Sequence, residues 1–369
     1  MEVYIVFAIF LFLFSFFELF KVGNGKFGNL FLFLSFLGSV LIVGGRWYTG
    51  TDWEVYEYLF NESTTFKEAL SVWQTEFGYG ILSWLVRSVT DDYSVFLIIH
   101  AVLFYGLLII SFKKIIPYPQ TAFFYYFTTN LGMVGANRQL LGIVLLLFGL
   151  SFLLNNNKKK FFVFLVSSFT FHATAYLAIV YYFLNRYISK KVIIISIIIA
   201  FLFGISPLPL QVFGSLGALN EHFMSKTEAY LDSAKAAAEE YGLTAAGAFK
   251  RILFLIIFLG IRDKAVIRLK NYNLFFNGYW VGILVYLVFS SSLNVMVSRG
   301  SLYFNLMEPL LITSIFLIVK KPIEKCFCLI LVFIVSILLM YQSIGGYPDA
   351  FDPYKGIWYN QDFVRRPHR

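Results

Sequence analysis

Long apolar segments separated by short polar turns occupy most of the chain. A membrane-spanning helix needs roughly 20 apolar residues, and a tilted or broken one needs fewer. The pattern therefore predicts spanning helices at 3–20, 27–45, 93–111, 119–136, 138–154, 191–206, 249–261, 272–291, 302–319 and 326–341.

Two further segments fit more than one interpretation. The stretch 161–186 is either one long helix or two short helices that meet near Phe171 and His172. The stretch 77–90 is short and amphipathic, which is typical of a helix that lies in the membrane interface.

The positive charges decide between these interpretations. Cytoplasmic loops of membrane proteins carry an excess of Lys and Arg. All the basic clusters face the cytoplasm if the N-terminus is outside, 77–90 is interfacial and 161–186 is two helices. This arrangement predicts an all-α polytopic protein with about 12 transmembrane helices in a single domain, residues 1–369. The clusters are Lys21/Lys26, Lys113/Lys114, Lys158–Lys160, Arg186/Lys190/Lys191, Arg262/Lys264/Arg268/Lys270 and Lys320/Lys321/Lys325.

Three polar segments then fall outside the membrane. Residues 46–92 form an outer loop with an interfacial helix, and 207–248 form an outer loop with an amphipathic helix at about 221–241. We interpret the latter as an exposed helix rather than a lid. Residues 342–369 form a polar, aromatic C-terminal tail.

Composition supports a membrane protein and excludes other classes. Of the 369 residues, 59% are hydrophobic and 14% are charged, whereas soluble domains have about 45–50% and about 25%. These values exclude a disordered chain, a soluble enzyme and a nucleic-acid-binding domain. Cys326 and Cys328 lie inside an apolar segment and predict neither a disulfide nor a metal site. The N-terminus has no basic region or cleavage site, so we expect a first spanning helix rather than a signal peptide.

Arginines at the predicted outer ends of helices are the first functional candidates, because charge at membrane depth is costly. Arg46 follows two glycines, which allow close backbone approach and favour a substrate contact over simple snorkelling. Arg138 lies in a bare turn between two apolar segments, where a function is more plausible than a connection. Arg299 and Arg251 lie at other outer ends, where snorkelling is the alternative.

Two carboxylates and a histidine accompany these arginines. Asp52 follows Arg46 in the same outer loop. Glu76 precedes the interfacial segment, where it is either a carboxylate stabilised by a helix dipole or an acid or base. His172 lies at the predicted break in 161–186, and a structural and a functional role are equally supported. His100 lies in the middle of a predicted helix and is expected to be a core residue.

Arginines with a few carboxylates suit a phosphate-containing ligand, because guanidinium binds phosphate bidentately and keeps its charge. No Asp/His cluster with metal-ligand spacing is visible in the sequence. We therefore expect no metal and no cofactor, and we expect arginines to neutralise a leaving pyrophosphate.

Six short motifs resemble the EpsG family of bacterial membrane proteins, relatives of the Wzy polymerases of O-antigen and capsular polysaccharide. They occur in the family's order, each at a predicted outer helix end. The motifs are Arg46 with Gly50-Thr51-Asp52 and Tyr56, Glu76-Phe77-Gly78-Tyr79, Asn137-Arg138-Gln139, Phe171-His172-Ala173-Thr174, Arg299 with Tyr303, and Asp352-Pro353-Tyr354.

The resemblance implies a GT-C-type glycosyltransferase in the bacterial inner membrane, with its active site facing the periplasm or outside. Such an enzyme transfers a glycan from undecaprenyl diphosphate to the non-reducing end of a lipid-linked repeat unit, usually with inversion. The implied partners are those lipid-linked oligosaccharides, the bilayer and a chain-length regulator, with no nucleic acid.

Site roles follow as hypotheses. The substrate and pyrophosphate ligands are expected among Arg46, Arg138, Arg299, Gln139, Arg251 and Tyr354. The base is expected to be Asp52, Glu76 or His172, and the sequence does not decide among them. The alternatives are a lipid-linked oligosaccharide flippase, which should show internal repeats, and an O-antigen ligase, which shares the donor chemistry.

Overall fold

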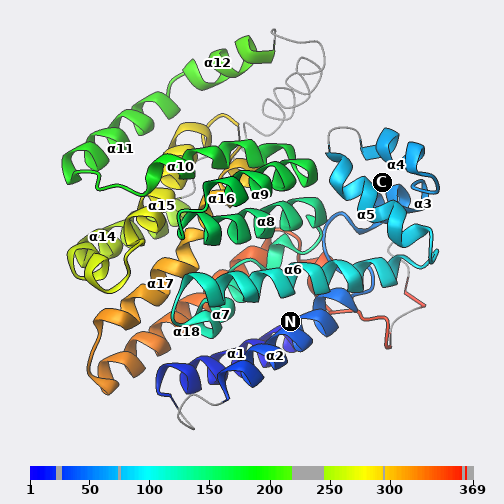
Figure 1. Cartoon of the computed structure of the whole chain (residues 1–369), viewed down its shortest axis with the longest axis horizontal. Coiled ribbons are helices and arrows are strands. Elements are labelled where there is room, and N and C mark those ends of the chain that lie inside the picture. Colours follow the sequence, from blue (N-terminus) through cyan, green and yellow to red (C-terminus); the bar gives the residue numbers. More distant parts are fainter. Residues whose placement is uncertain (22–26, 74–75, 218–244, 294–295, 360–361, 364–369) are drawn as a thin grey trace. The chain divides into compact units, whose positions relative to one another are not determined.

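The computed structural model is all-helical in the part of the chain that it describes (Figure 1). Described are residues 1–21, 27–73, 76–217, 245–293, 296–359 and 362–363. About 80% of these described residues are helical, and no strand occurs among them. The predicted amphipathic helix at 221–241 lies outside the described residues.

Five helices in these ranges are long and apolar enough to cross a membrane, and three shorter apolar helices accompany them. The long ones are α1 (Glu2–Leu19), α6 (Tyr93–Ile115), α15 (Tyr272–Phe289), the run Met296–Ile318 and α18 (Pro322–Gly345); the shorter ones cover Gly28–Gly44, Asn137–Leu153 and Ala173–Leu184. This confirms an all-helical polytopic protein, and the count of 12 spans stays a prediction.

The described residues form two compact units. The first unit comprises Met1–Tyr176 with Val319–Arg369, and the second comprises Leu177–Ile318.

In the first unit, α6 packs against α8, α2 and the π-helical turn η2, while α1 and α18 pack against α7 (Figure 1). Three short helices, α3 to α5, follow the polar turn after η2. The elements not yet bounded are α2 (Gly28–Ser39), η2 (Val40–Gly44), α3 (Trp53–Asn61), α4 (Phe66–Trp73), α5 (Phe77–Arg87), α7 (Pro119–Thr129), η4 (Leu131–Met133), α8 (Asn137–Leu153), α9 (Lys158–Phe171) and α19 (Pro348–Phe351).

The ambiguous stretch 161–186 is broken at the predicted place. Helix α9 ends at Phe171, and His172 is extended, with φ −154° and ψ 125°. The 3-10 helix η5 (Ala173–Val180) and α10 (Tyr181–Leu184) follow. The other ambiguous stretch, 77–90, contains the short amphipathic helix α5, which packs on α4 and α9.

Lysines of two basic clusters of the first unit lie at one end of its helices. Lys113 Nζ donates to Asn29 Oδ1 at 2.9 Å, and Lys114 Nζ lies 4.6 Å from the ring centre of Phe148. Lys160 Nζ lies 5.2 Å from the ring centre of Phe152. This clustering agrees with the positive-inside pattern, since these lysines share one end of the bundle.

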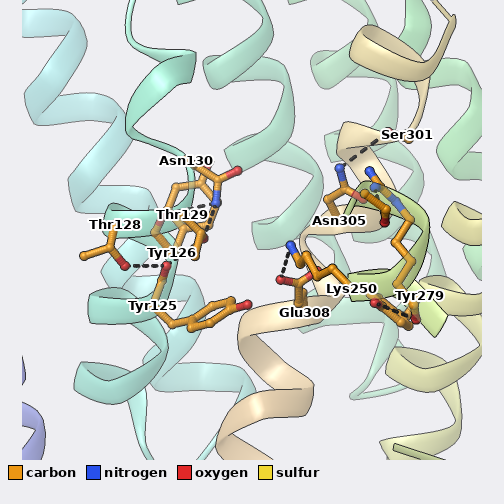
Figure 2. A network of polar contacts seen from close by, with 12 residues as sticks. Tyr125, Tyr126, Thr128, Thr129, Asn130, Lys250, Tyr279, Ser301, Asn305 and Glu308 are labelled. Atoms are coloured by element: carbon orange, nitrogen blue, oxygen red, sulfur yellow. Dashed lines mark hydrogen bonds and ion pairs between the residues drawn. The ribbon is translucent and has the colours of Figure 1, made fainter. Parts of the chain in front are cut away.

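A half-buried carboxylate caps α7 at this end. Glu18 accepts from the backbone N–H of Gln120 at 2.8 Å and of Thr121 at 2.9 Å, and from the Thr121 hydroxyl at 2.8 Å. At the other end of α7, Asn130 Nδ2 donates to the carbonyl of Tyr126 at 3.0 Å and closes the helix (Figure 2). Both termini of α7 are therefore satisfied by side chains.

In the second unit, α15 packs against α11, α14, α16 and α17. Arg262 connects α14 to neighbouring segments and is only 1% exposed. Its Nε donates to Asn273 Oδ1 at 2.9 Å and its Nη1 donates to the carbonyl of Ile188 at 2.7 Å. The remaining elements of the second unit are α11 (Lys190–Gly204), α12 (Leu208–Gly217), α14 (Ala245–Arg268), η6 (Met296–Gly300), α16 (Leu302–Asn305) and α17 (Met307–Ile318).

Candidate functional site

Two of the predicted site residues form an ion pair in the first unit. Arg138 is the second residue of α8, and its Nη1 pairs with the Glu76 carboxylate oxygen Oε2, although the two residues are 62 positions apart. The Arg138 side chain is 32% exposed and that of Glu76 is 11% exposed. The Arg138 side chain is therefore partly accessible, whereas the Glu76 side chain is mostly buried.

Two stacked aromatic rings orient the Arg138 guanidinium. It lies 5.4 Å from the ring centre of Tyr56 and 5.3 Å from that of Trp73, and those two rings stack at 5.8 Å. The Arg138 Nε also donates to the Tyr56 hydroxyl at 3.0 Å. Burial raises the pKa of the Tyr56 phenol, so the hydroxyl stays neutral. These contacts fix the plane of the guanidinium.

The break after α9 brings His172 to the same carboxylate. Glu76 Oε1 accepts from the backbone N–H of Ala173 at 3.3 Å and lies 3.9 Å from His172 Nε2. The other ring nitrogen, Nδ1, lies 2.7 Å from the Thr174 hydroxyl. Glu76, Arg138 and His172 thus form one cluster, which we call the Glu–Arg–His site.

A glycine allows the close packing that this arrangement requires. Gly78 faces α9, where a Cβ would collide with the Thr170 hydroxyl. Glu76 stands at the N-cap position of α5 but makes no capping hydrogen bond there. Its carboxylate therefore serves the Glu–Arg–His site rather than the N-terminus of its own helix.

A tight turn places Arg138 at the start of α8. Gly135 has φ +120° and Gly50 has φ +100°, conformations that favour glycine. The two turns meet where the Thr51 N–H donates to the carbonyl of Val134 at 3.4 Å. The bare turn that the sequence marked as functional is therefore held by the loop that follows Arg46.

Arg46 itself is buried, with 2% exposure. Its Nη1 donates to the carbonyl of Val43 at 2.7 Å and its Nη2 donates to Asn137 Oδ1 at 2.9 Å. Asp52, by contrast, is exposed at the N-cap position of α3, and Gln139 is buried in α8. Arg46 thus bonds Asn137, the residue that directly precedes Arg138.

The C-terminal segment binds the same polar turn. Tyr354 donates its hydroxyl hydrogen to the carbonyl of Ile42 at 2.9 Å. The Trp47 N–H donates to the carbonyl of Lys355, and the Ile357 N–H donates to the carbonyl of Gly45, both at 2.9 Å. Tyr354 is thus buried against the start of the outer loop, where it anchors the tail.

The other predicted cations belong to the second unit. Arg251 lies over the ring of Tyr286, 3.8 Å from its centre. Beside it, Lys250 Nζ pairs with Glu308 Oε1 at 2.7 Å (Figure 2). Arg299 is exposed in the π-helix Met296–Gly300.

Some contributors to the site had weak signals in the sequence. Trp73 was not among the predicted site residues. His100, expected to be a core residue, is indeed buried, but its Nε2 donates to the carbonyl of Asn137 at 2.9 Å. Among the described residues, no group of three or more His, Cys, Asp or Glu side chains could hold a metal ion.

Together, the apolar helices and the partly exposed arginine paired with a buried carboxylate define an integral membrane protein with a site suited to an anionic ligand. The EpsG family model matches residues 29–355, and the chain belongs to this family of Wzy-type exopolysaccharide and O-antigen polymerases. No curated protein and no solved structure matches the chain.

Proposed function

We propose that the protein extends a polysaccharide at the outer face of the bacterial inner membrane, using glycans linked to undecaprenyl diphosphate. Membership of a polymerase family supports polysaccharide polymerisation in general. The observation that carries the finer proposal is the Glu–Arg–His site, where a partly exposed arginine adjoins a carboxylate and a histidine.

In the proposed reaction, an acceptor sugar hydroxyl attacks the anomeric carbon of the donor. A new glycosidic C–O bond forms, the anomeric C–O bond to the diphosphate breaks, and undecaprenyl diphosphate leaves. We expect inversion at the anomeric carbon and no metal. Arg138 would stabilise the negative charge on the leaving diphosphate, helped by the positive end of the α8 dipole.

The proton of the acceptor hydroxyl would pass to the Glu76–His172 pair. This pair is favoured over Asp52 because it adjoins Arg138, whereas Asp52 is exposed at the N-cap position of α3. General base catalysis contributes about 10²–10⁴-fold, so loss of the base should be measurable. Arg251 and Arg299 of the second unit remain proposed ligands of the anionic substrate.

The proposed overall architecture is a GT-C-type fold with about 12 spanning helices. The bilayer and the lipid-linked donor and acceptor are its proposed partners, and a chain-length regulator is a further one. A gathering of lysines at one end of the first unit supports a cytoplasmic position for that end.

The test is polymerisation by the purified protein in liposomes, with lipid-linked repeat units isolated from cells that lack it. Wild type should yield a ladder of products and release undecaprenyl diphosphate. Glu76→Gln and His172→Gln should lower the rate about 100-fold or more, whereas Asp52→Asn should stay near wild type. Movement of repeat units across the membrane without linkage would indicate a flippase and refute the proposal.

A further inference from the structure

The residue that precedes Arg138 is held by an unusual number of buried polar contacts. Asn137 accepts from Arg46 Nη2 through its side-chain oxygen at 2.9 Å, and its amide donates to the Tyr93 hydroxyl at 3.3 Å. Its backbone carbonyl accepts from His100 Nε2 at 2.9 Å. Asn137 is 1% exposed, so none of these contacts faces solvent.

These contacts join three separate elements at the first turn of α8. Arg46 follows η2, Tyr93 and His100 belong to α6, and Asn137 opens α8. Helix α6 approaches η2 so closely that a Cβ on Gly44 would come within 3.0 Å of the Ala101 Cβ. The first turn of a helix is otherwise prone to fray, because its N–H groups lack partners within the helix.

Direct ligand binding by Arg46 does not fit this geometry. The side chain is 2% exposed, and two of its nitrogens already donate to protein acceptors. Reaching a diphosphate would require both bonds to break and the guanidinium to leave its place beside Trp53, whose ring centre is 5.8 Å away. The buried acceptors left behind would then lack a partner, which is unfavourable.

We propose that Arg46, Asn137 and His100 are positioning residues, which hold the first turn of α8 so that Arg138 points toward the donor diphosphate. This inference rests on the proposed donor-binding role of Arg138. Arg46 and His100 act through Asn137, and neither touches the substrate.

The test measures binding of farnesyl diphosphate, a short soluble polyprenyl diphosphate, to the full chain in detergent. Arg138→Ala should weaken binding at least tenfold, and Arg46→Gln should weaken it about tenfold. Because Arg46 acts only through the placement of Arg138, the double variant should bind no more weakly than Arg138→Ala alone.

A conservative replacement separates positioning from stability. Gln places an amide nitrogen near the position of the His100 Nε2, so His100→Gln should retain affinity, whereas His100→Leu should weaken binding about fivefold. The two His100 variants also test the positioning role if Arg46→Gln does not fold. Glu18→Gln is the control, because it weakens part-buried hydrogen bonds at the opposite end of the first unit and should leave affinity within twofold of wild type.

Three results would overturn the positioning role: unchanged affinity in Arg46→Gln and His100→Leu, multiplicative losses in the double variant, or an equal loss in Glu18→Gln. Unchanged affinity in Arg138→Ala would instead overturn the proposed donor-binding role. The two failures are therefore distinguishable.

Discussion

At the residue scale, Glu76 has two neighbours with different chemistry. One carboxylate oxygen pairs with Arg138, and the other faces Ala173 N–H and His172. A donor diphosphate would compete with Glu76 for the Arg138 guanidinium, since both are anions. The same carboxylate thus connects anion binding with the proposed proton transfer to His172.

Charge and geometry at Arg138 can be tested separately. Arg138→Lys keeps the positive charge but loses the planar guanidinium group, which bonds Tyr56 and Glu76 and lies near the Trp73 ring. We expect activity to fall about tenfold or more, with less loss than in Arg138→Ala, because a lysine acts as a point charge. Steady-state rates in liposomes measure this. Equal activity of Arg138→Lys and wild type would contradict an oriented guanidinium.

The sequence identified much of this site but not its connections. Glu76, Arg138 and His172 stood out because each is polar at the end of an apolar segment. Their convergence depends on the packing of α5, α8 and α9, which one-dimensional spacing does not reveal. Arg46 had the same sequence features as Arg138. Yet Arg46 is 2% exposed and bonds the Val43 carbonyl and Asn137, whereas the Arg138 side chain is 32% exposed.

At the scale of elements, side chains that are distant in the sequence fix the ends of helices. Glu18 of α1 caps α7, and the tail residues around Tyr354 bond the turn after η2. The hydrophobic pattern located α1 and α18 well, whereas the helix predicted at 119–136 ends at Thr129 as the shorter α7. The pattern could not predict these caps, because a capping residue from another helix leaves no periodicity in the sequence.

Replacing Glu18 should lower stability without impairing the site. Glu18→Gln keeps the size of the side chain but turns charge-assisted hydrogen bonds to α7 into neutral ones. We expect the free energy of unfolding to fall by at most about 3 kcal/mol. A hydrogen bond to a charged group contributes about 1.5–3 kcal/mol, and the variant keeps a neutral bond. Thermal unfolding in detergent measures the loss. An unchanged melting temperature would mean that the carboxylate does not hold α7.

At the scale of the whole molecule, the hydrophobic pattern and the basic clusters predicted an all-helical membrane protein correctly. The exact number of spans was less accessible, because several apolar segments are short or broken. The break at His172 was one of two interpretations, and the extended backbone there now selects it.

Membrane orientation is testable with cysteine labelling in a Cys326→Ser/Cys328→Ser background. In intact spheroplasts, a membrane-impermeant maleimide should label Asp349→Cys, in the tail, and should leave Lys159→Cys unlabelled until the membrane is permeabilised. The physical reason is the gathering of lysines at one end of the first unit. Labelling of Lys159→Cys in intact spheroplasts would show the opposite orientation, with the Glu–Arg–His site at the cytoplasmic face.

The most direct test of the central claim is the surface-polysaccharide ladder of cells that lack this protein, complemented with wild type, Arg138→Ala or Arg87→Ala. Arg87 is a matched control, because it pairs with Asp91 at the end of α5, away from the Glu–Arg–His site. We predict a full ladder with wild type and Arg87→Ala. Arg138→Ala, present at normal levels, should yield only a single repeat unit. A full ladder with Arg138→Ala would contradict the account.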